Sequence, residues 1–225
     1  MLRGALLCAA LGLASCGQTA TATFSVGAEV AISADELGLP TELMAMDGTV
    51  AALPCGPMGT CPSSAEAQVS CEADVCDPTP QEVSVPAGDV IDIDMIASDV
   101  ESLFAEIDSI EILEVDYQID ANTLTFPTEP IEVFWGPPDV DTIDEAMGVR
   151  LLGTVPVVAA GETGAGSVAL DVAGSTALSA YFETVAHRFR VFARTQVDLE
   201  PGQRWPAGSL SVAVRMRVRV SGSLL

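Results

Sequence analysis

The sequence contains no lysine, a single histidine and few aromatic residues, and these absences narrow the functions open to it. All nine basic residues are arginines. The sequence has 32 Asp and Glu residues, so its net charge is −23. A chain with this charge repels nucleic acid and anionic lipid head groups. The composition therefore predicts a protein without a nucleic-acid partner.

The motifs of the common catalytic and nucleotide-binding sites are also absent. His187 lies in a stretch that alternates like a strand, and nothing beside it suggests a histidine-based triad. No GxSxG nucleophile motif occurs, and residues 164–170 (GAGSVAL) lack the second glycine at the required place. Phosphate-loop and dinucleotide fingerprints are missing too. We therefore expect no catalytic residue and no cofactor.

The first seventeen residues, MLRGALLCAALGLASCG, have the organisation of an export signal. Arg3 supplies the positive start, and residues 5–14 form an apolar run too short to span a bilayer as a helix. The run ends in Leu13-Ala14-Ser15-Cys16, which resembles the lipobox of bacterial lipoprotein signal peptides. An ordinary secretory signal with an incidental cysteine is the alternative.

The lipobox resemblance implies cleavage after residue 15, a diacylglyceryl thioether on Cys16 and acylation of the new amino terminus. Two or more acyl chains anchor a protein stably in a membrane. Because residue 17 is glycine rather than aspartate, the sorting rule of such lipoproteins also favours the outer membrane if the host is Gram-negative. Residues 16–22 would form a short tether that reaches about 20 Å at most. No later run of eighteen apolar residues follows.

Four cysteines remain in the mature chain, within a Pro-, Gly- and Ser-rich insertion at about 52–80. An even number of cysteines in an exported chain predicts disulfides. We favour the local pairs Cys55–Cys61 and Cys71–Cys76, because both loops are short. A nested arrangement, Cys55–Cys76 with Cys61–Cys71, is the close alternative. The spacings do not match a paired CxxC zinc site.

The rest of the chain alternates between apolar and polar residues in short runs. This pattern predicts strands at 22–33, 82–95, 112–120, 130–138, 149–159, 166–172, 187–197 and 209–222. The proline in 149–159 favours an edge strand. Many short strands with turns between them indicate a mainly β fold, an antiparallel β-sandwich that occupies 23–225 as one domain.

Short helical segments interrupt the strands. Residues 33–36 (SADE) form a capping box, although Gly38 and Pro40 limit the helix to about one turn. A second capping box at 98–101 predicts a short helix at 99–106. Ser175 is expected to cap a third helix, whose apolar face contains Leu178, Tyr181, Phe182 and Val185.

The charges divide the chain unevenly. Residues 4–148 contain 27 acidic residues and no basic residue, whereas residues 150–225 contain eight arginines and five acids. We interpret this as an internal ion-pair ladder that joins two basic strands, expected to be neighbours, to an acidic strand. Its expected members are Arg188, Arg190, Arg194, Arg215, Arg217, Arg219, Glu114, Asp116 and Asp120. The alternatives are a surface patch that binds anionic sugars or phosphates and a solvated face with no partner.

Two weaker signals concern the acidic residues. Asp139, Asp141, Asp144 and Glu145 could bind calcium, but their spacing is not that of an EF-hand loop. Paired carboxylates could also act as the acid and base of a hydrolase, although 32 acids single out no pair.

Taken together, the sequence predicts a non-enzymatic, lipid-anchored envelope lipoprotein. Its expected partners are the membrane, through the anchor, and another envelope protein or a glycan. The alternatives are a calcium-assisted adhesion module and a carboxylate-dependent hydrolase.

Overall fold

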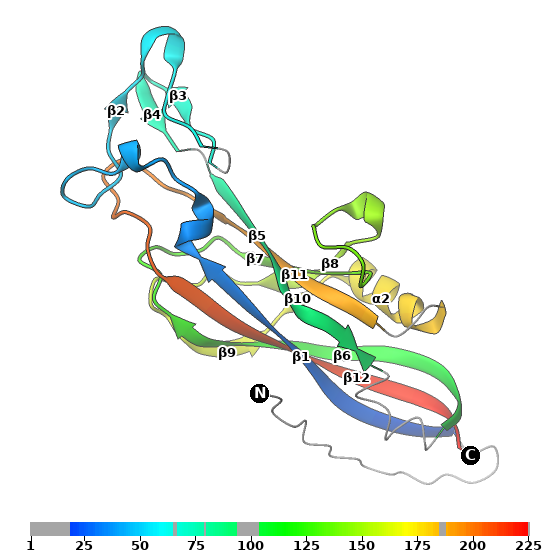
Figure 1. Cartoon of the computed structure of the whole chain (residues 1–225). Coiled ribbons are helices and arrows are strands. Elements are labelled where there is room, and N and C mark those ends of the chain that lie inside the picture. The colour runs from blue at the N-terminus through cyan, green and yellow to red at the C-terminus, as the bar shows by residue number, and fades with distance from the viewer. Residues whose placement is uncertain (1–18, 65–66, 79, 94–103, 185–187, 225) are drawn as a thin grey trace.

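The computed structural model describes residues 19–64, 67–78, 80–93, 104–184 and 188–224. Two large antiparallel sheets pack face to face, and a small third sheet projects from one end (Figure 1). The prediction of a mainly β, antiparallel sandwich is therefore confirmed. None of the helices in the described ranges is long and apolar enough to cross a membrane.

The first large sheet has four strands in the order β1-β12-β6-β9, and the second has five in the order β10-β8-β7-β11-β5. The four-stranded sheet contains β1 (Thr19–Ser33), β6 (Phe104–Asn122), β9 (Gly164–Ser167) and β12 (Ser209–Leu224). The five-stranded sheet contains β5 (Gln81–Asp92), β7 (Ile131–Gly136), β8 (Arg150–Val155), β10 (Ala169–Leu170) and β11 (Arg188–Val197).

The order of the strands corrects two expectations. The arginine strands β11 and β12 are not neighbours, because the turn between them carries the chain from one sheet to the other. The strand predicted at 149–159 ends at Val155, before Pro156, and it pairs with β7 on one side and with the two-residue β10 on the other. Its proline therefore follows the strand and does not mark a sheet edge.

The core lies between the two sheets. In β12 every second side chain from Leu210 to Val220 is buried, as the two-residue period of a strand requires. The facing sheet contributes Phe189, Val191 and Ala193 from β11 to the same core. This burial turns the intervening arginines of β12 outward.

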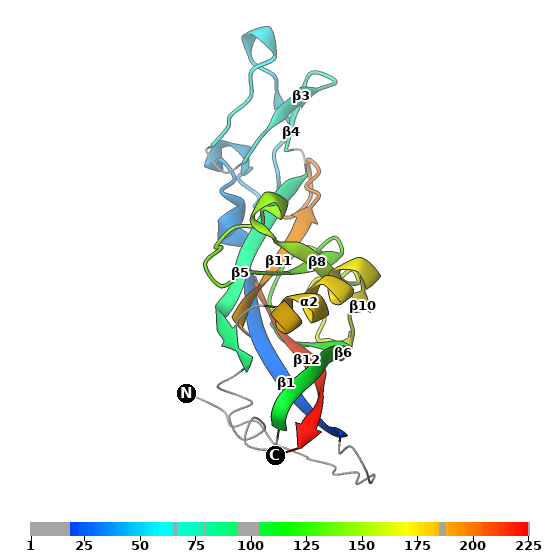
Figure 2. The ribbon, with the colours of Figure 1, turned by 90° about the vertical axis from the view of Figure 1, so that its right-hand side faces the viewer.

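Helix α2 (Val172–Thr184) packs along one side of the sandwich, next to β6 and β8 (Figure 2). It buries Leu178 and Phe182, as predicted, whereas Val185 lies outside the described residues. The rings of Tyr181 and Trp135 are in contact at a tilt of 51°, with centroids 5.3 Å apart. The helix begins earlier than expected. Asp171 accepts a hydrogen bond from the Gly174 N–H at 2.7 Å, so it fills the capping role predicted for Ser175.

The capping box at 33–36 is confirmed. Ser33 caps the 3₁₀ helix η1 (Ala34–Leu37), and Gly38 ends it in the left-handed conformation with φ of 57°. Three further 3₁₀ segments are η2 (Thr41–Leu43), η3 (Pro57–Gly59) and η4 (Glu145–Met147). Most of the helix predicted at 99–106 lies outside the described residues, and residues 104–106 belong to β6.

The small sheet contains β2 (Leu53–Pro54), β3 (Ser70–Glu72) and β4 (Val75–Asp77) in the order β2-β4-β3. Two disulfides join it, Cys55–Cys71 and Cys61–Cys76. Both the local and the nested pairings predicted from the spacing are wrong. The pairing is crossed because β2 lies beside β4, which brings Cys55 and Cys61 to the β3–β4 hairpin.

The molecule is elongated, and its two ends differ. The small sheet, which we call the Cys-rich sheet (β2, β3 and β4), forms one end (Figure 1). The start of β1 and the end of β12, which pair as Thr19 and Ser223, lie at the opposite end. Because β1 already begins at Thr19, residues 19–22 belong to the sandwich and the expected tether is correspondingly shorter.

Candidate functional site

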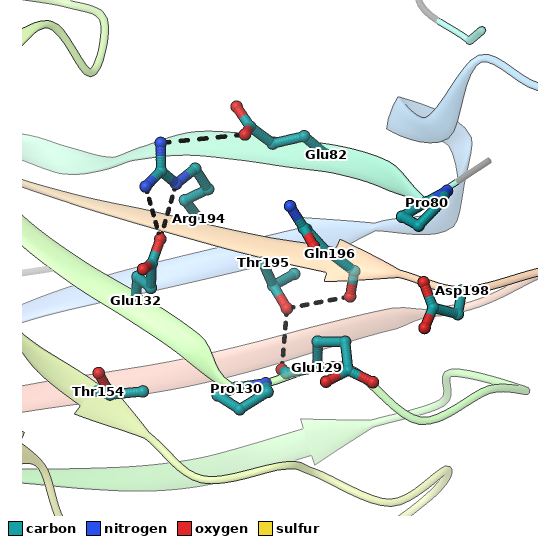
Figure 3. A pocket seen from close by; sticks show the side chains of 10 residues that line it. All are labelled: Pro80, Glu82, Glu129, Pro130, Glu132, Thr154, Arg194, Thr195, Gln196 and Asp198. Carbon is teal, nitrogen blue, oxygen red and sulfur yellow. Dashed lines mark hydrogen bonds and ion pairs between the residues drawn. The ribbon is translucent and has the colours of Figure 1, made fainter.

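A cleft of about 590 Å³ opens on the outer face of the five-stranded sheet (Figure 3). It reaches Pro80, three residues after the end of β4 in the Cys-rich sheet. It lies where β5 and β7 begin and where β8 and β11 end. Its lining residues are Pro80, Glu82, Glu129, Pro130, Glu132, Thr154, Arg194, Thr195, Gln196 and Asp198.

Arg194 of β11 is the only cationic residue that lines this cleft. Its Nε and Nη2 lie 2.8 Å and 2.7 Å from Oε2 of Glu132, which stands directly opposite on β7. Its Nη1 lies 3.9 Å from a carboxylate oxygen of Glu82 on β5, on the other side. The guanidinium also lies over the ring of Phe134, 4.9 Å from the centroid. These contacts fix Arg194 as part of the cleft floor.

A buried hydroxyl group forms a hydrogen bond that connects two segments at the rim of the cleft. Thr195, which is 2% exposed, donates a hydrogen bond to the carbonyl oxygen of Glu129 at 2.9 Å. The Glu129 N–H donates in turn to the carbonyl of Gln196 at 3.1 Å. The exposed carboxylates of Glu129 and Asp198 face the same end of the cleft (Figure 3).

The cleft therefore carries four carboxylates and one guanidinium, and two of the carboxylates, those of Glu82 and Glu132, already contact that guanidinium. Carboxylates accept hydrogen bonds and attract cationic groups. The arrangement favours a ligand that presents ammonium, guanidinium or hydroxyl groups over an anionic one.

A second charged surface lies on the outer face of the four-stranded sheet. Arg217 of β12 is directly opposite Glu114 of β6 and forms an ion pair with it. Arg219 pairs with Glu111 at 3.0 Å. The alternating arginines of β12 thus meet carboxylates of the acidic part of the chain, although Glu111 was not among the expected partners.

The third pair of this surface is weaker. Arg215 stands opposite Asp116 in the register, but no ion pair within 4.0 Å joins them, and Asp116 accepts a hydrogen bond from the Ser167 hydroxyl at 3.0 Å. Asp120 takes no part, because the register shifts between Ser211 and Val212 and leaves it without an opposite residue. A second shift skips Leu113, and this bulge is what brings Glu111 opposite Arg219.

Two of the three arginines of β11 form ion pairs within their own sheet, and no ion pair among the described residues joins β11 to the acidic strand β6. Arg188 forms an ion pair with Asp92 of β5 at 3.3 Å, and Arg194 contacts Glu132 and Glu82 as described. Arg190 stands opposite Gly136, and its buried Nε has no hydrogen-bond partner. The single ladder predicted from the sequence is therefore two separate sets of ion pairs, one on each outer face.

The weak calcium candidates do not come together. Within the described ranges, the one group of three metal-ligating side chains with ligand atoms within 4.8 Å of one another is Cys55, Cys61 and Cys76, which belong to the disulfides. Asp144 instead caps η4 by accepting a hydrogen bond from the Ala146 N–H at 2.8 Å. The acidic loop is thus organised by its own backbone.

The surroundings of Tyr181, on α2, affect the ionisation of its hydroxyl. Burial raises its pKa above the ordinary value, and the charge of Asp139 adds to this effect. Its hydroxyl donates a hydrogen bond to the carbonyl of Arg188 at 2.8 Å, which links α2 to the start of β11.

Other sequence-based candidates lie outside the described residues, namely Cys16 and His187. The cleft itself was not predicted. The alternation of Glu132 with Ile131 and Val133 indicates an outward carboxylate, but which arginine it meets depends on the strand order. Glu129 and Asp198 follow no periodic pattern, because they lie just outside the ends of β7 and β11.

Comparisons with protein-family models, with curated proteins and with solved structures find no match for this chain.

Proposed function

We propose that this protein is a lipid-anchored, non-enzymatic binding module of the cell envelope, attached to the outer membrane through Cys16. The observation that carries the proposal is the difference between the two ends of the molecule. β1 begins at Thr19, three residues after Cys16, at the end opposite to the Cys-rich sheet (Figure 1). Three residues span at most about 11 Å, so an acylated Cys16 would hold this end at the membrane surface.

The opposite end would then be the part of the molecule that reaches a partner. The cleft, with Glu129 and Asp198 at its rim, reaches Pro80, which follows the Cys-rich sheet in the chain (Figure 3). Two disulfides brace this region, and a rigid scaffold that presents loops and polar groups is a common arrangement for binding. The negative charge of the cleft supports a protein or glycan partner that offers cationic or hydroxyl groups.

The anchor is tested by metabolic labelling with a fatty-acid probe. We expect the wild type to be labelled and the Cys16→Ser variant to lose the label. Cys8→Ser is the matched control, because it removes a cysteine of the same leader and should leave labelling intact. Equal labelling of wild type and Cys16→Ser would refute the anchor.

The carboxylate-dependent hydrolase is the second candidate, because the cleft gathers four carboxylates. Turnover of an oligosaccharide that is abolished by Glu129→Gln or Asp198→Asn would favour it, whereas binding without turnover favours the module.

Calcium-assisted adhesion has less support, since Asp139, Asp141 and Asp144 do not form a ligand cluster. A rise in melting temperature with calcium that their Asn variants remove would reverse this ranking.

A further inference from the structure

We propose that the Cys55–Cys71 disulfide is a site of thiol–disulfide exchange, where the thiolate of an external neutral or basic molecule attacks and starts a change of disulfide pairing. The Sγ atoms of Cys55, Cys61 and Cys76 lie within 4.8 Å of one another, and Cys71 is bonded to the first of them. The two disulfides therefore form one cluster of four sulfurs. This inference does not depend on the anchor or on the cleft.

The two disulfides differ in access to solvent. Cys71 is exposed, Cys55 and Cys61 are half-buried, and Cys76 is 0% exposed, so the Cys55–Cys71 disulfide contains the exposed cysteine and the Cys61–Cys76 disulfide the buried one. Gly59 contributes to this difference, because a Cβ at that position would stand 3.9 Å from the Cys71 Sγ. Since exchange rates depend on access to the attacked sulfur, an external thiolate reaches Cys71 first.

The first step forms a mixed disulfide. The external thiolate attacks the Sγ of Cys71 and bonds to it. The bond between Cys71 and Cys55 breaks, and its electron pair leaves with Cys55 as a thiolate. This thiolate lies within 4.8 Å of both sulfurs of the Cys61–Cys76 disulfide.

Two further exchanges complete the sequence. The Cys55 thiolate attacks Cys61 and releases Cys76 as a thiolate. Cys76 stands directly opposite Cys71 in the β3–β4 ladder. Opposite residues of antiparallel strands have Cα atoms about 4.5–5.5 Å apart, within the range of disulfides. The Cys76 thiolate therefore attacks Cys71 and expels the external thiol.

The products are the disulfides Cys55–Cys61 and Cys71–Cys76, together with the regenerated thiol. Two disulfides are present before and after, so the sequence needs no oxidant or reductant and uses the thiol as a catalyst. The crossed and the local connectivity are thus two states of one module, and an external thiol interconverts them.

The charges around the hairpin select the thiol. Glu72 follows Cys71, Asp77 follows Cys76, and Asp74 lies in the turn between the strands. These carboxylates repel an anionic thiol and attract a cationic one. Cysteamine should therefore react several-fold faster than mercaptoacetate, and 1 M NaCl should reduce this difference because salt screens exposed charges.

The test is a time course of the folded wild type with cysteamine near neutral pH, quenched with N-ethylmaleimide and followed by peptide mapping of adducts and disulfides. We expect the first adduct on Cys71, about tenfold faster than on Cys61 or Cys76, and then Cys55–Cys61 and Cys71–Cys76 pairs. Adducts on Cys61 or Cys76 as early as on Cys71 would overturn the proposal. So would an absence of new pairs once Cys71 has reacted, or a Cys71 that does not react.

A double variant isolates the first step. Cys61→Ser with Cys76→Ser removes the Cys61–Cys76 disulfide and should stop the reaction at the Cys71 adduct with an alkylated Cys55. Denatured wild type is the matched control, because unfolding should remove the difference between the cysteines. The wild-type time course decides the question even if the double variant does not fold.

Discussion

Arg194 of β11 holds Glu132 of β7 through two nitrogens of its guanidinium, and the two residues face each other directly across the five-stranded sheet (Figure 3). The contact lies in the floor of the cleft and not at its rim. Arg194 therefore shapes the cleft, whereas Glu129 and Asp198 remain free to meet a ligand.

Replacing Arg194 by Lys should lower the free energy of unfolding. A lysine ammonium cannot reproduce the forked contact to Glu132 or the stacking on Phe134. Because both partners are about a third exposed, solvent screening limits the loss to about 1 kcal/mol.

Urea unfolding measures this change, and Arg204→Lys is the matched control. Arg204 is exposed and forms no ion pair among the described residues, so its replacement should change stability by less than about 0.5 kcal/mol. Equal effects of the two substitutions would contradict the role of Arg194.

On the outer face of the four-stranded sheet, we expect a measurable coupling free energy between Arg217 and Glu114. In a double-mutant cycle with Arg217→Gln and Glu114→Gln, the coupling free energy for unfolding should be about 0.2–1 kcal/mol in low salt and smaller in 1 M NaCl. The side chains are 53% and 36% exposed, which keeps the coupling small.

The pair Arg215 and Asp116 provides the comparison for this cycle. The two residues are opposite in the register but are not joined by an ion pair, so their cycle should give a coupling near zero. A coupling there as large as that of Arg217 and Glu114 would show that the charges interact without contact.

The sequence was sufficient to find most of the long strands but not to assign them to sheets. The strand predicted at 166–172, for example, is divided between β9 and β10, which lie in different sheets. β12 could be predicted because each buried Val or Met alternates with an exposed or half-buried residue, and this pattern needs only local information. That β11 and β12 lie in different sheets depends on where the turn after Val197 leads, which no local pattern specifies. For this reason the prediction of a single ion-pair ladder was wrong.

The disulfides and the cleft show the same limit. The number of cysteines predicts two bridges, but the crossed pairing follows from β2 lying beside β4. Likewise Glu132 is an outward residue by its alternation, yet its contact with Arg194 requires β7 and β11 to be neighbours. Bulges also change the pairing, because the bulge in β6 that skips Leu113 places Glu111 opposite Arg219.

Gly174 should not tolerate a side chain. It lies in the first turn of α2 against β8, and a Cβ there would stand 1.6 Å from the carbonyl oxygen of Leu151. Its own carbonyl accepts a hydrogen bond from the Trp135 indole at 3.0 Å. Gly174→Ala should therefore destabilise the fold by about 1–3 kcal/mol, despite the better helix propensity of alanine.

Thermal unfolding followed by tryptophan fluorescence measures the effect of Gly174→Ala. Gly164→Ala is the control, because nothing lies within 4 Å of a Cβ at that position. If the two variants melted at the same temperature, α2 would not be packed against β8 as described.

The raised pKa of Tyr181 predicts that the protein loses stability at alkaline pH. Burial raises its pKa in the folded state above the ordinary value near 10, so the folded state holds the proton more tightly than the unfolded state. Its stabilising contribution is complete below pH 10 and is lost as the pH rises through the folded pKa. An ionised Tyr181 also cannot donate its hydrogen bond to Arg188.

The free energy of unfolding from pH 8 to 11 should therefore fall more steeply in the wild type than in Tyr181→Phe. Tyr117→Phe is the control that keeps the Tyr181 hydroxyl. Parallel curves for wild type and Tyr181→Phe would mean that this hydroxyl does not contribute to the pH dependence.

The measurement that tests the central claim most directly is site-specific photocrosslinking in the native host. A photoreactive residue replaces Met58, which is 99% exposed at the Cys-rich end, or Thr21, which is exposed near the start of β1. A lipid-anchored binding module predicts that position 58 crosslinks to an envelope protein or glycan and that position 21 crosslinks to lipid. Crosslinks to lipid at position 58, with partner crosslinks at position 21 alone, would contradict the proposed orientation.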